Sequence, residues 1–139
     1  MNSWHYLLSA WILSLIASLG SLFFSEVMGY PPCVLCWYQR IAMYPLVVIL
    51  PWALFPFNRQ MIKALLPLSL IGWGIALYHN LLYYKILPQS HSPCVKGISC
   101  TSVQLEWLGF ITIPLLSWLA FSLIIICSLL ALKKGSSHE

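Results

Sequence analysis

Four long stretches of the sequence contain no Asp, Glu, Lys or Arg, at residues 6–24, 41–57, 64–84 and 107–132. A helix needs about 17 to 25 residues to cross the roughly 30 Å hydrocarbon core of a bilayer, so each stretch is long enough to be a span. Only 7% of the 139 residues are charged and 60% are hydrophobic, whereas a soluble domain carries about 25% charged residues. The sequence therefore predicts a membrane protein.

The apolar stretches are expected to be helices, because backbone polar groups cannot stay unpaired in lipid and the alternating pattern of membrane strands is absent from them. The first stretch ends in Phe23-Phe24 and has no Lys or Arg before it. We therefore interpret it as a retained helix rather than a cleaved secretory signal. The predicted fold is an all-α membrane protein, a four-transmembrane-helix bundle formed by one domain over residues 1–139.

An even number of spans places both termini on the same side of the membrane as the link at 58–63, and the loops around 26–40 and 85–106 on the other side. The terminal side carries four Lys and Arg residues and the other side carries three: Arg59, Lys63, Lys133 and Lys134 against Arg40, Lys85 and Lys96. The positive-inside rule then favours cytoplasmic termini and extracytoplasmic loops in a multi-pass protein of the cell membrane. The basic residues are scattered, so no nucleic-acid partner is expected.

Four of the five cysteines fall in the two extracytoplasmic loops: Cys33 and Cys36 in the first, Cys94 and Cys100 in the second. Disulfides persist on that side of the membrane, and four cysteines allow three connectivities. The CxxC spacing of the first pair is used in thiol exchange, although purely structural disulfides are an equal alternative on this motif alone. Cys127 lies inside the last span, where a free cysteine packs as a small hydrophobe.

Metal and haem sites are less well supported by the same cysteines. Structural zinc sites usually have two short-spaced cysteine pairs, and only the first pair here is CxxC. Haem attachment needs a histidine directly after the second cysteine, where this sequence has Trp37. We therefore expect no metal ligand.

Arg40 favours the redox interpretation of the first pair. If a helix begins near Cys36, then Cys36 and Arg40 are four residues apart on one helical face. A nearby cation and a helix N-terminus both stabilise a thiolate, so the sequence predicts that Cys36 is the activated thiol. The alternative for Arg40 is a side chain that snorkels at a helix end. Electrons that reach a dithiol at the bilayer surface need an acceptor, and the lipid phase offers quinones.

These residues resemble the disulfide bond formation protein B (DsbB) family, particularly its short Gram-positive members of the BdbC type. The resemblance is carried by PCVLCWYQR at 32–40, the second cysteine pair, WLGFITIPLLS at 107–117 and the four-span layout, and it covers nearly the whole chain. It implies a membrane thiol:quinone oxidoreductase that reoxidises an extracytoplasmic thioredoxin-fold thiol oxidase (DsbA/BdbD-like). Two electrons would pass to menaquinone or ubiquinone, supporting disulfide bond formation in exported proteins.

The resemblance also implies catalytic roles for the four loop cysteines. Cys94 and Cys100 would form the disulfide that the reduced partner attacks, with Cys94 as the target. Cys33 and Cys36 would form the pair that reoxidises it through an interloop intermediate, and Cys36 would contact the quinone directly as thiolate or adduct. The alternative is a structural tetraspan membrane protein stapled by two disulfides.

Two further residues are implied to bind the quinone. Arg40 would polarise a quinone oxygen, and His79 matches a histidine near the quinone in the family. For His79, a hydrogen-bonded residue of the bundle is an equal alternative. Gln39 stands where longer members carry an acid, so any role of that acid is absent from this chain.

Overall fold

The computed structural model describes residues 2–29, 32–88, 90, 106–107 and 111–136. It contains α1 (Ser3–Leu22), which continues into the π-helical segment η1 (Phe23–Val27), and then α2 (Val34–Leu54), α3 (Arg59–Tyr83) and α4 (Ile113–Gly135). Two short strands, β1 (Glu106–Trp107) and β2 (Ile111–Thr112), pair antiparallel just before α4. Four helices in the described part of the chain are long and apolar enough to cross a membrane. The predicted all-α bundle is confirmed.

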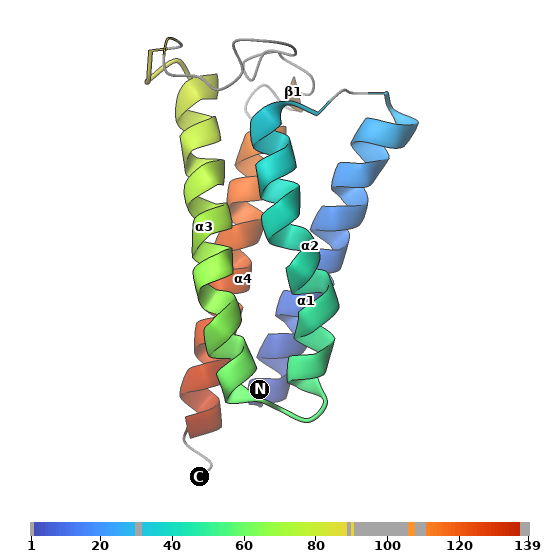
Figure 1. Ribbon diagram of the computed structural model, residues 1–139, viewed down its shortest axis with the longest axis vertical. Coiled ribbons are helices and arrows are strands. Elements are labelled where there is room, and N and C mark those ends of the chain that lie inside the picture. The colour runs from blue at the N-terminus through green and yellow to red at the C-terminus, as the bar shows by residue number, and fades with distance from the viewer. Residues whose placement is uncertain (1, 30–31, 89, 91–105, 108–110, 137–139) are drawn as a thin grey trace.

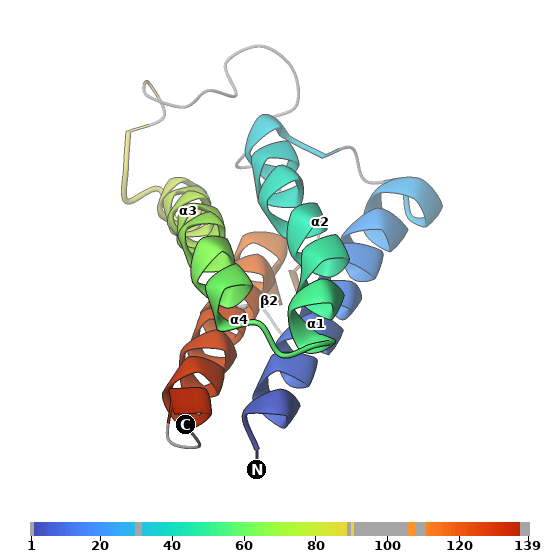
Figure 2. The ribbon, with the colours of Figure 1, turned by 60° about the horizontal axis from the view of Figure 1, so that its bottom comes forward.

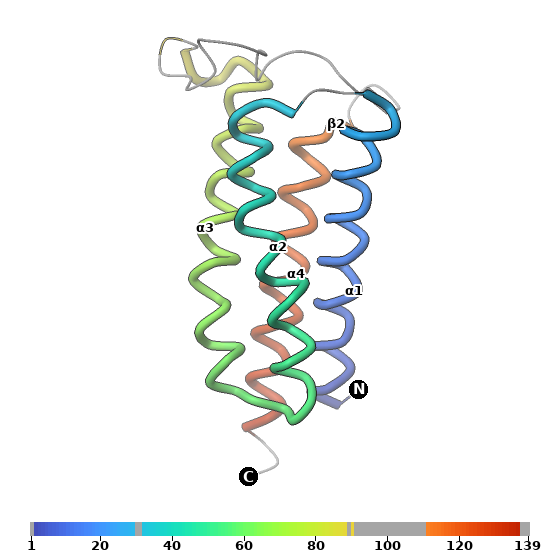
Figure 3. The backbone as a smooth tube through the Cα atoms, turned by 45° about the vertical axis from the view of Figure 1, so that its right-hand side comes forward, coloured from blue at the N-terminus to red at the C-terminus, as the bar shows by residue number. Residues whose placement is uncertain are grey.

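The four helices form a ring in which each packs against its neighbours in the chain, and α4 closes the ring against α1. Both termini lie at one end of the bundle, together with the link between α2 and α3 (Figures 1 and 3). Figure 2 brings that end forward and shows the link beside both termini. The opposite end holds the start of α2 with Cys33 and Cys36, and we call it the cysteine end.

The helix boundaries differ from the predicted spans because hydropathy alone does not set them. The helix α2 begins at Val34, seven residues before 41, since the charged Arg40 is buried inside the helix rather than ending it. The predicted stretch at 107–132 begins too early, because Trp107 lies in β1 and α4 begins at Ile113. There the side chain of Thr112 accepts a hydrogen bond from the backbone N–H of Leu115, and a proline stands in the first turn.

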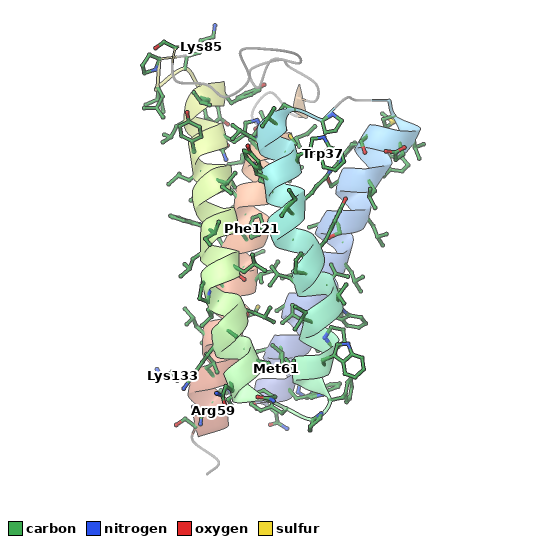
Figure 4. All side chains as sticks on the ribbon, viewed as in Figure 1. Trp37, Arg59, Met61, Lys85, Phe121 and Lys133 are labelled. Atoms are coloured by element: carbon green, nitrogen blue, oxygen red, sulfur yellow. The ribbon has the colours of Figure 1, made fainter. Side chains whose placement is uncertain are left out.

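Apolar side chains fill the middle of the bundle. Phe121 and Ile124 of α4 are fully buried, and Leu46 and Leu50 of α2 are 1% exposed. Gly72 of α3 lets Phe121 approach closely, because a Cβ atom at Gly72 would overlap the Phe121 ring. Figure 4 shows Phe121 midway along the bundle. In lipid, where apolar surface drives helix association only weakly, such small-residue contacts bring helices close enough to pack.

The outer surface of the bundle is apolar over much of its length. Large side chains from all four long helices are more than half exposed, among them Leu19 (64%), Val48 (63%), Ile71 (59%) and Ile126 (51%). An apolar surface of this extent suits contact with lipid rather than water. The charged residues Arg59 and Lys133 lie at the terminal end, and Lys85 lies at the cysteine end (Figure 4).

Candidate active site

The two thiols of the CxxC motif lie together at the start of α2. Cys33 is the N-cap residue, with extended backbone dihedrals, and Cys36 lies in the first turn. Their Sγ atoms are 3.3 Å apart, and both are free thiols. Cys33 is 4% exposed, whereas Cys36 is only partly buried. The helix thus begins two residues before Cys36, close to where the motif predicted.

His79 of α3 completes a group of three at this position. Its ring is 3% exposed, and its Nε2 atom lies 3.8 Å from the Cys33 Sγ atom. The two residues are 46 positions apart in the chain. The structure thus brings Cys33, Cys36 and His79 together, as a site that includes all three would require.

Two further polar side chains hold the far side of the His79 ring. The amide nitrogen of Gln39 lies 3.0 Å from His79 Nδ1, and the hydroxyl of Ser117 donates to Gln39 Oε1 at 2.6 Å. An amide NH₂ group can only donate, so in this arrangement Nδ1 accepts and the ring proton stays on Nε2. That Nε2–H group faces the sulfur of Cys33, where it can donate to a thiolate.

The electrostatics of the pair favour a thiolate at Cys33. The pKa of the Cys33 thiol is lowered, chiefly by the hydrogen bond from the Cys36 side chain. Burial opposes this, but the hydrogen bond and electrostatic interaction with His79 and the backbone N–H of Cys36 lower the pKa further. The sequence predicted the activated thiol at Cys36, whereas here the thiol with the lowered pKa is Cys33, which has the hydrogen bond with Cys36 and the contact with His79.

Arg40 is directed toward α1. Its Nε and terminal NH₂ groups donate to the hydroxyl and the backbone carbonyl of Ser21, each at 2.8 Å, and the guanidinium lies 5.4 Å from the centre of the Trp37 ring. Arg40 is 7% exposed, so it does not snorkel to the surface. It joins α2 to α1, and its predicted contact with quinone stays a prediction.

The other cysteines are separated from this site or lie outside the described residues. Cys94 and Cys100 lie outside the described residues, so their predicted roles are untested. Cys127 packs against the apolar core, as expected for a free cysteine within a span.

Sequence reasoning missed Gln39, Ser117 and Ser21 as members of this polar cluster. In the sequence, Gln39 was notable only because it stands where longer family members carry an acid. The two serines were treated as ordinary residues of apolar stretches. The available signal was their position, because polar side chains within a span usually face the bundle interior and find partners there. Asn80, next to His79, follows the same rule and donates to the carbonyl of Pro114 at 2.9 Å.

The same three side chains also form a set of metal donors. The sulfur atoms of Cys33 and Cys36 and a ring nitrogen of His79 all lie within 4.8 Å of one another. Thiolate and imidazole are the ligands that soft and borderline metals prefer. The zinc site weighed from the sequence had four cysteine ligands and did not include His79.

Comparison with known proteins finds a family match over nearly the whole chain. Residues 3–131 match the family described as "Disulfide bond formation protein DsbB". The chain belongs to the DsbB family. It is 46% identical to the disulfide bond formation protein C of Bacillus subtilis over 134 residues, which are 96% of each chain. It is 42% identical over 128 residues to the probable disulfide formation protein C of Halalkalibacterium halodurans, covering 92% of this chain and 93% of that one. A probable disulfide formation protein of Metapseudomonas resinovorans is 42% identical over 125 residues, covering 89% and 87%. No solved structure matches the chain.

Membership of the DsbB family makes this a disulfide bond formation protein, as the resemblance implied. Because forming a disulfide removes two electrons from a pair of thiols, the activity is that of an oxidoreductase. The four candidate spans make it a multi-pass membrane protein. The dithiol at the start of α2 is the described group that can carry this chemistry.

Proposed function

We propose that the protein is a membrane thiol:quinone oxidoreductase that reoxidises an extracytoplasmic thioredoxin-fold thiol oxidase. The observation that carries the proposal is the pair of free thiols, 3.3 Å apart, at the first turn of a helix long and apolar enough to span the membrane. Such a position is reached both by a soluble partner at the surface and by a hydrophobic acceptor in lipid.

The surroundings of Cys36 suit an apolar, flat acceptor. Cys36 is partly exposed and is followed by Trp37 and Tyr38, whose side chains are 51% and 47% exposed. Figure 4 shows Trp37 at the cysteine end. A quinone bound there would supply a two-electron acceptor. Cys33 is buried on the other side of the pair, so Cys36 is the thiol that a molecule arriving from lipid meets first.

The proposed electron path uses the four loop cysteines in sequence. A thiolate of the reduced partner attacks Cys94 and displaces the Cys100 thiolate, which forms a mixed disulfide. The partner's second thiol then breaks that mixed disulfide, so the partner leaves oxidised and Cys94 and Cys100 are left as thiols. The reduced Cys94–Cys100 pair is then reoxidised by the Cys33–Cys36 disulfide, which becomes the dithiol. That dithiol gives two electrons and two protons to quinone, so the net reaction converts one partner dithiol and one quinone to one disulfide and one quinol.

The structure suggests what His79 does in this path. A disulfide exchanges faster when the departing thiol has a low pKa. The Nε2–H group of His79 stabilises a thiolate at Cys33 and so favours its departure. Gln39 holds the ring in the orientation that this needs.

The side of the membrane also belongs to the proposal. Thiol exchange with exported proteins requires the cysteine end to be extracytoplasmic, and both termini then lie in the cytoplasm. Arg59 and Lys133 at the terminal end agree with this orientation under the positive-inside rule.

The test is quinone absorbance after a reduced thioredoxin-fold dithiol oxidase is added to the purified protein, with ubiquinone and menaquinone each supplied. We expect loss of oxidised quinone, abolished by Cys36→Ser. Cys127→Ala is the matched control, because it removes a free cysteine that packs in the core away from the pair. Absence of turnover with either quinone, while the loop cysteines stay in disulfides, would favour the structural tetraspan alternative.

A further inference from the structure

Three donor atoms at the cysteine end already have the spacing of a metal site. The Cys33 and Cys36 sulfurs are 3.3 Å apart, the Cys33 sulfur is 3.8 Å from His79 Nε2, and all three donors lie within 4.8 Å of one another. Zinc bonds of about 2.3 Å to sulfur and about 2.0 to 2.1 Å to nitrogen, at tetrahedral angles, separate two sulfurs by about 3.8 Å and a sulfur and a nitrogen by about 3.6 Å. The two spacings to the Cys33 sulfur lie within about 0.5 Å of these values, and the Cys36 sulfur would move toward His79 by at most about 1.2 Å.

The charge of the site also suits a divalent cation. Two thiolates carry two negative charges, which would balance Zn²⁺ with a neutral imidazole as the third ligand. Cys33 and His79 are 4% and 3% exposed, and a buried ion is stable only when its charge is compensated. The partly exposed side of Cys36 leaves the fourth tetrahedral position accessible, as in zinc sites with three protein ligands.

Gln39 and Ser117 can support the metal-bound form of His79. When Nε2 binds a metal, the proton moves to Nδ1, which then needs an acceptor. Turning the Gln39 amide by half a rotation presents Oε1 to Nδ1 and the NH₂ group to the Ser117 hydroxyl, which accepts as well as donates. Both contacts, at 3.0 Å and 2.6 Å, are kept with their directions reversed.

We propose that the reduced Cys33–Cys36 pair and His79 form a three-donor site for Zn²⁺, and that the bound ion holds the pair reduced and reversibly blocks electron transfer. Binding releases the remaining thiol protons and changes no oxidation state. The disulfide form cannot bind, because its sulfurs are no longer thiolates. The binding half of the proposal is independent of the proposed function, and the inhibitory half rests on it.

The binding test uses the full chain in detergent with Cys94→Ser, Cys100→Ser and Cys127→Ala, so that Cys33 and Cys36 are its only cysteines. Co²⁺ added to the protein reduced by a phosphine should give one equivalent of tetrahedral complex with sulfur-to-cobalt charge-transfer bands, displaced by Zn²⁺. The same protein with the pair oxidised should give none, which is a control without a further mutation. Equal binding in both redox states would overturn the site.

Variants then identify the ligands. His79→Ala should weaken Zn²⁺ binding at least tenfold and alter the cobalt spectrum, and Gln39→Leu should weaken it about tenfold, as loss of an outer-shell partner does. His5→Ala, an exposed histidine near the N-terminus, is the matched control and should change neither. Unchanged affinity in His79→Ala would show that the site is not the one proposed.

Inhibition is measured separately, by titrating Zn²⁺ into the quinone assay of the wild-type chain and reversing it with a chelator. The inhibition constant of Gln39→Leu should rise by the same factor as its dissociation constant, which separates this site from zinc bound by the partner. Full turnover at saturating Zn²⁺ would overturn the inhibitory half. A protein that binds one zinc but never reduces quinone would retain the metal site and lose the proposed function.

Discussion

The cysteine end and the middle of the bundle are held together by different contacts. At the cysteine end, buried polar side chains of α2 reach all three other helices: Gln39 contacts His79 of α3 and Ser117 of α4, and Arg40 bonds to Ser21 of α1. In the middle, apolar residues pack around Phe121. Polar contacts fix which groups meet, whereas apolar packing depends mainly on volume. The chemistry therefore sits where partners are specified by hydrogen bonds.

The largest stability effect is expected in the middle, from Gly72→Ala. The added Cβ atom would overlap the Phe121 ring, and overpacking of this kind costs about 1 to 3 kcal/mol. Gly74→Ala is the matched control on the same helix, because no atom lies within 4 Å of its Cβ position. Thermal unfolding in detergent measures both variants. If they unfold alike, the contact between α3 and α4 is not as close as described.

At the cysteine end, the largest effect concerns the reactivity of Cys33. A thiolate is protonated as the pH falls through its pKa. Because the pKa of Cys33 is lowered, this protonation occurs below pH 8.5, which is about the ordinary pKa of a cysteine. Alkylation of the reduced protein, followed by peptide mass spectrometry and scaled to its high-pH plateau, should therefore stay near that plateau at pH 7. His79→Ala should move the midpoint upward. A midpoint at or above 8.5 in the wild type would contradict the assignment of the thiolate.

A substitution of Arg40 tests whether this residue only links α1 and α2 or also binds quinone. If it also meets quinone, Arg40→His should raise the KM for quinone several-fold and change the KM for the partner oxidase less. Ser21→Ala is the reference, since it removes one acceptor of Arg40 and leaves the guanidinium in place. Equal loss of stability in both variants, with neither KM changed, would make Arg40 a purely structural link between α1 and α2.

The smallest effect is expected for Ser117→Ala, which removes one hydrogen bond between helices. Such bonds contribute about 0.6 kcal/mol on average in membrane proteins. Ser9→Ala is the control, because among the described residues the Ser9 hydroxyl donates to a carbonyl of its own helix, at 2.8 Å. The difference in unfolding free energy between the two variants gives the contribution of the bond to Gln39. A difference of zero would mean that Gln39 does not need Ser117 to hold His79.

Much of the fold could be predicted from hydropathy, and the errors in the predicted span boundaries have physical causes. The predicted span at 41–57 excluded Arg40 because spans were taken as stretches without charge, whereas α2 begins at Val34 and the buried Arg40 is bonded to Ser21. The span at 107–132 began too early because apolar residues in a short hairpin count like apolar residues in a helix. The cap formed by Thr112 and the proline in the first turn mark where α4 starts.

The sequence by itself determined the number of spans, the CxxC pair and its place at the start of a helix, because composition and short spacing are local properties. Only the tertiary structure decided that His79, 46 residues from Cys33, faces its sulfur and that Gln39 and Ser117 orient the ring. It also decided that the His79 ring contacts Cys33. These outcomes depend on the rotation of each helix about its axis, which packing between helices sets and which no single stretch of sequence contains.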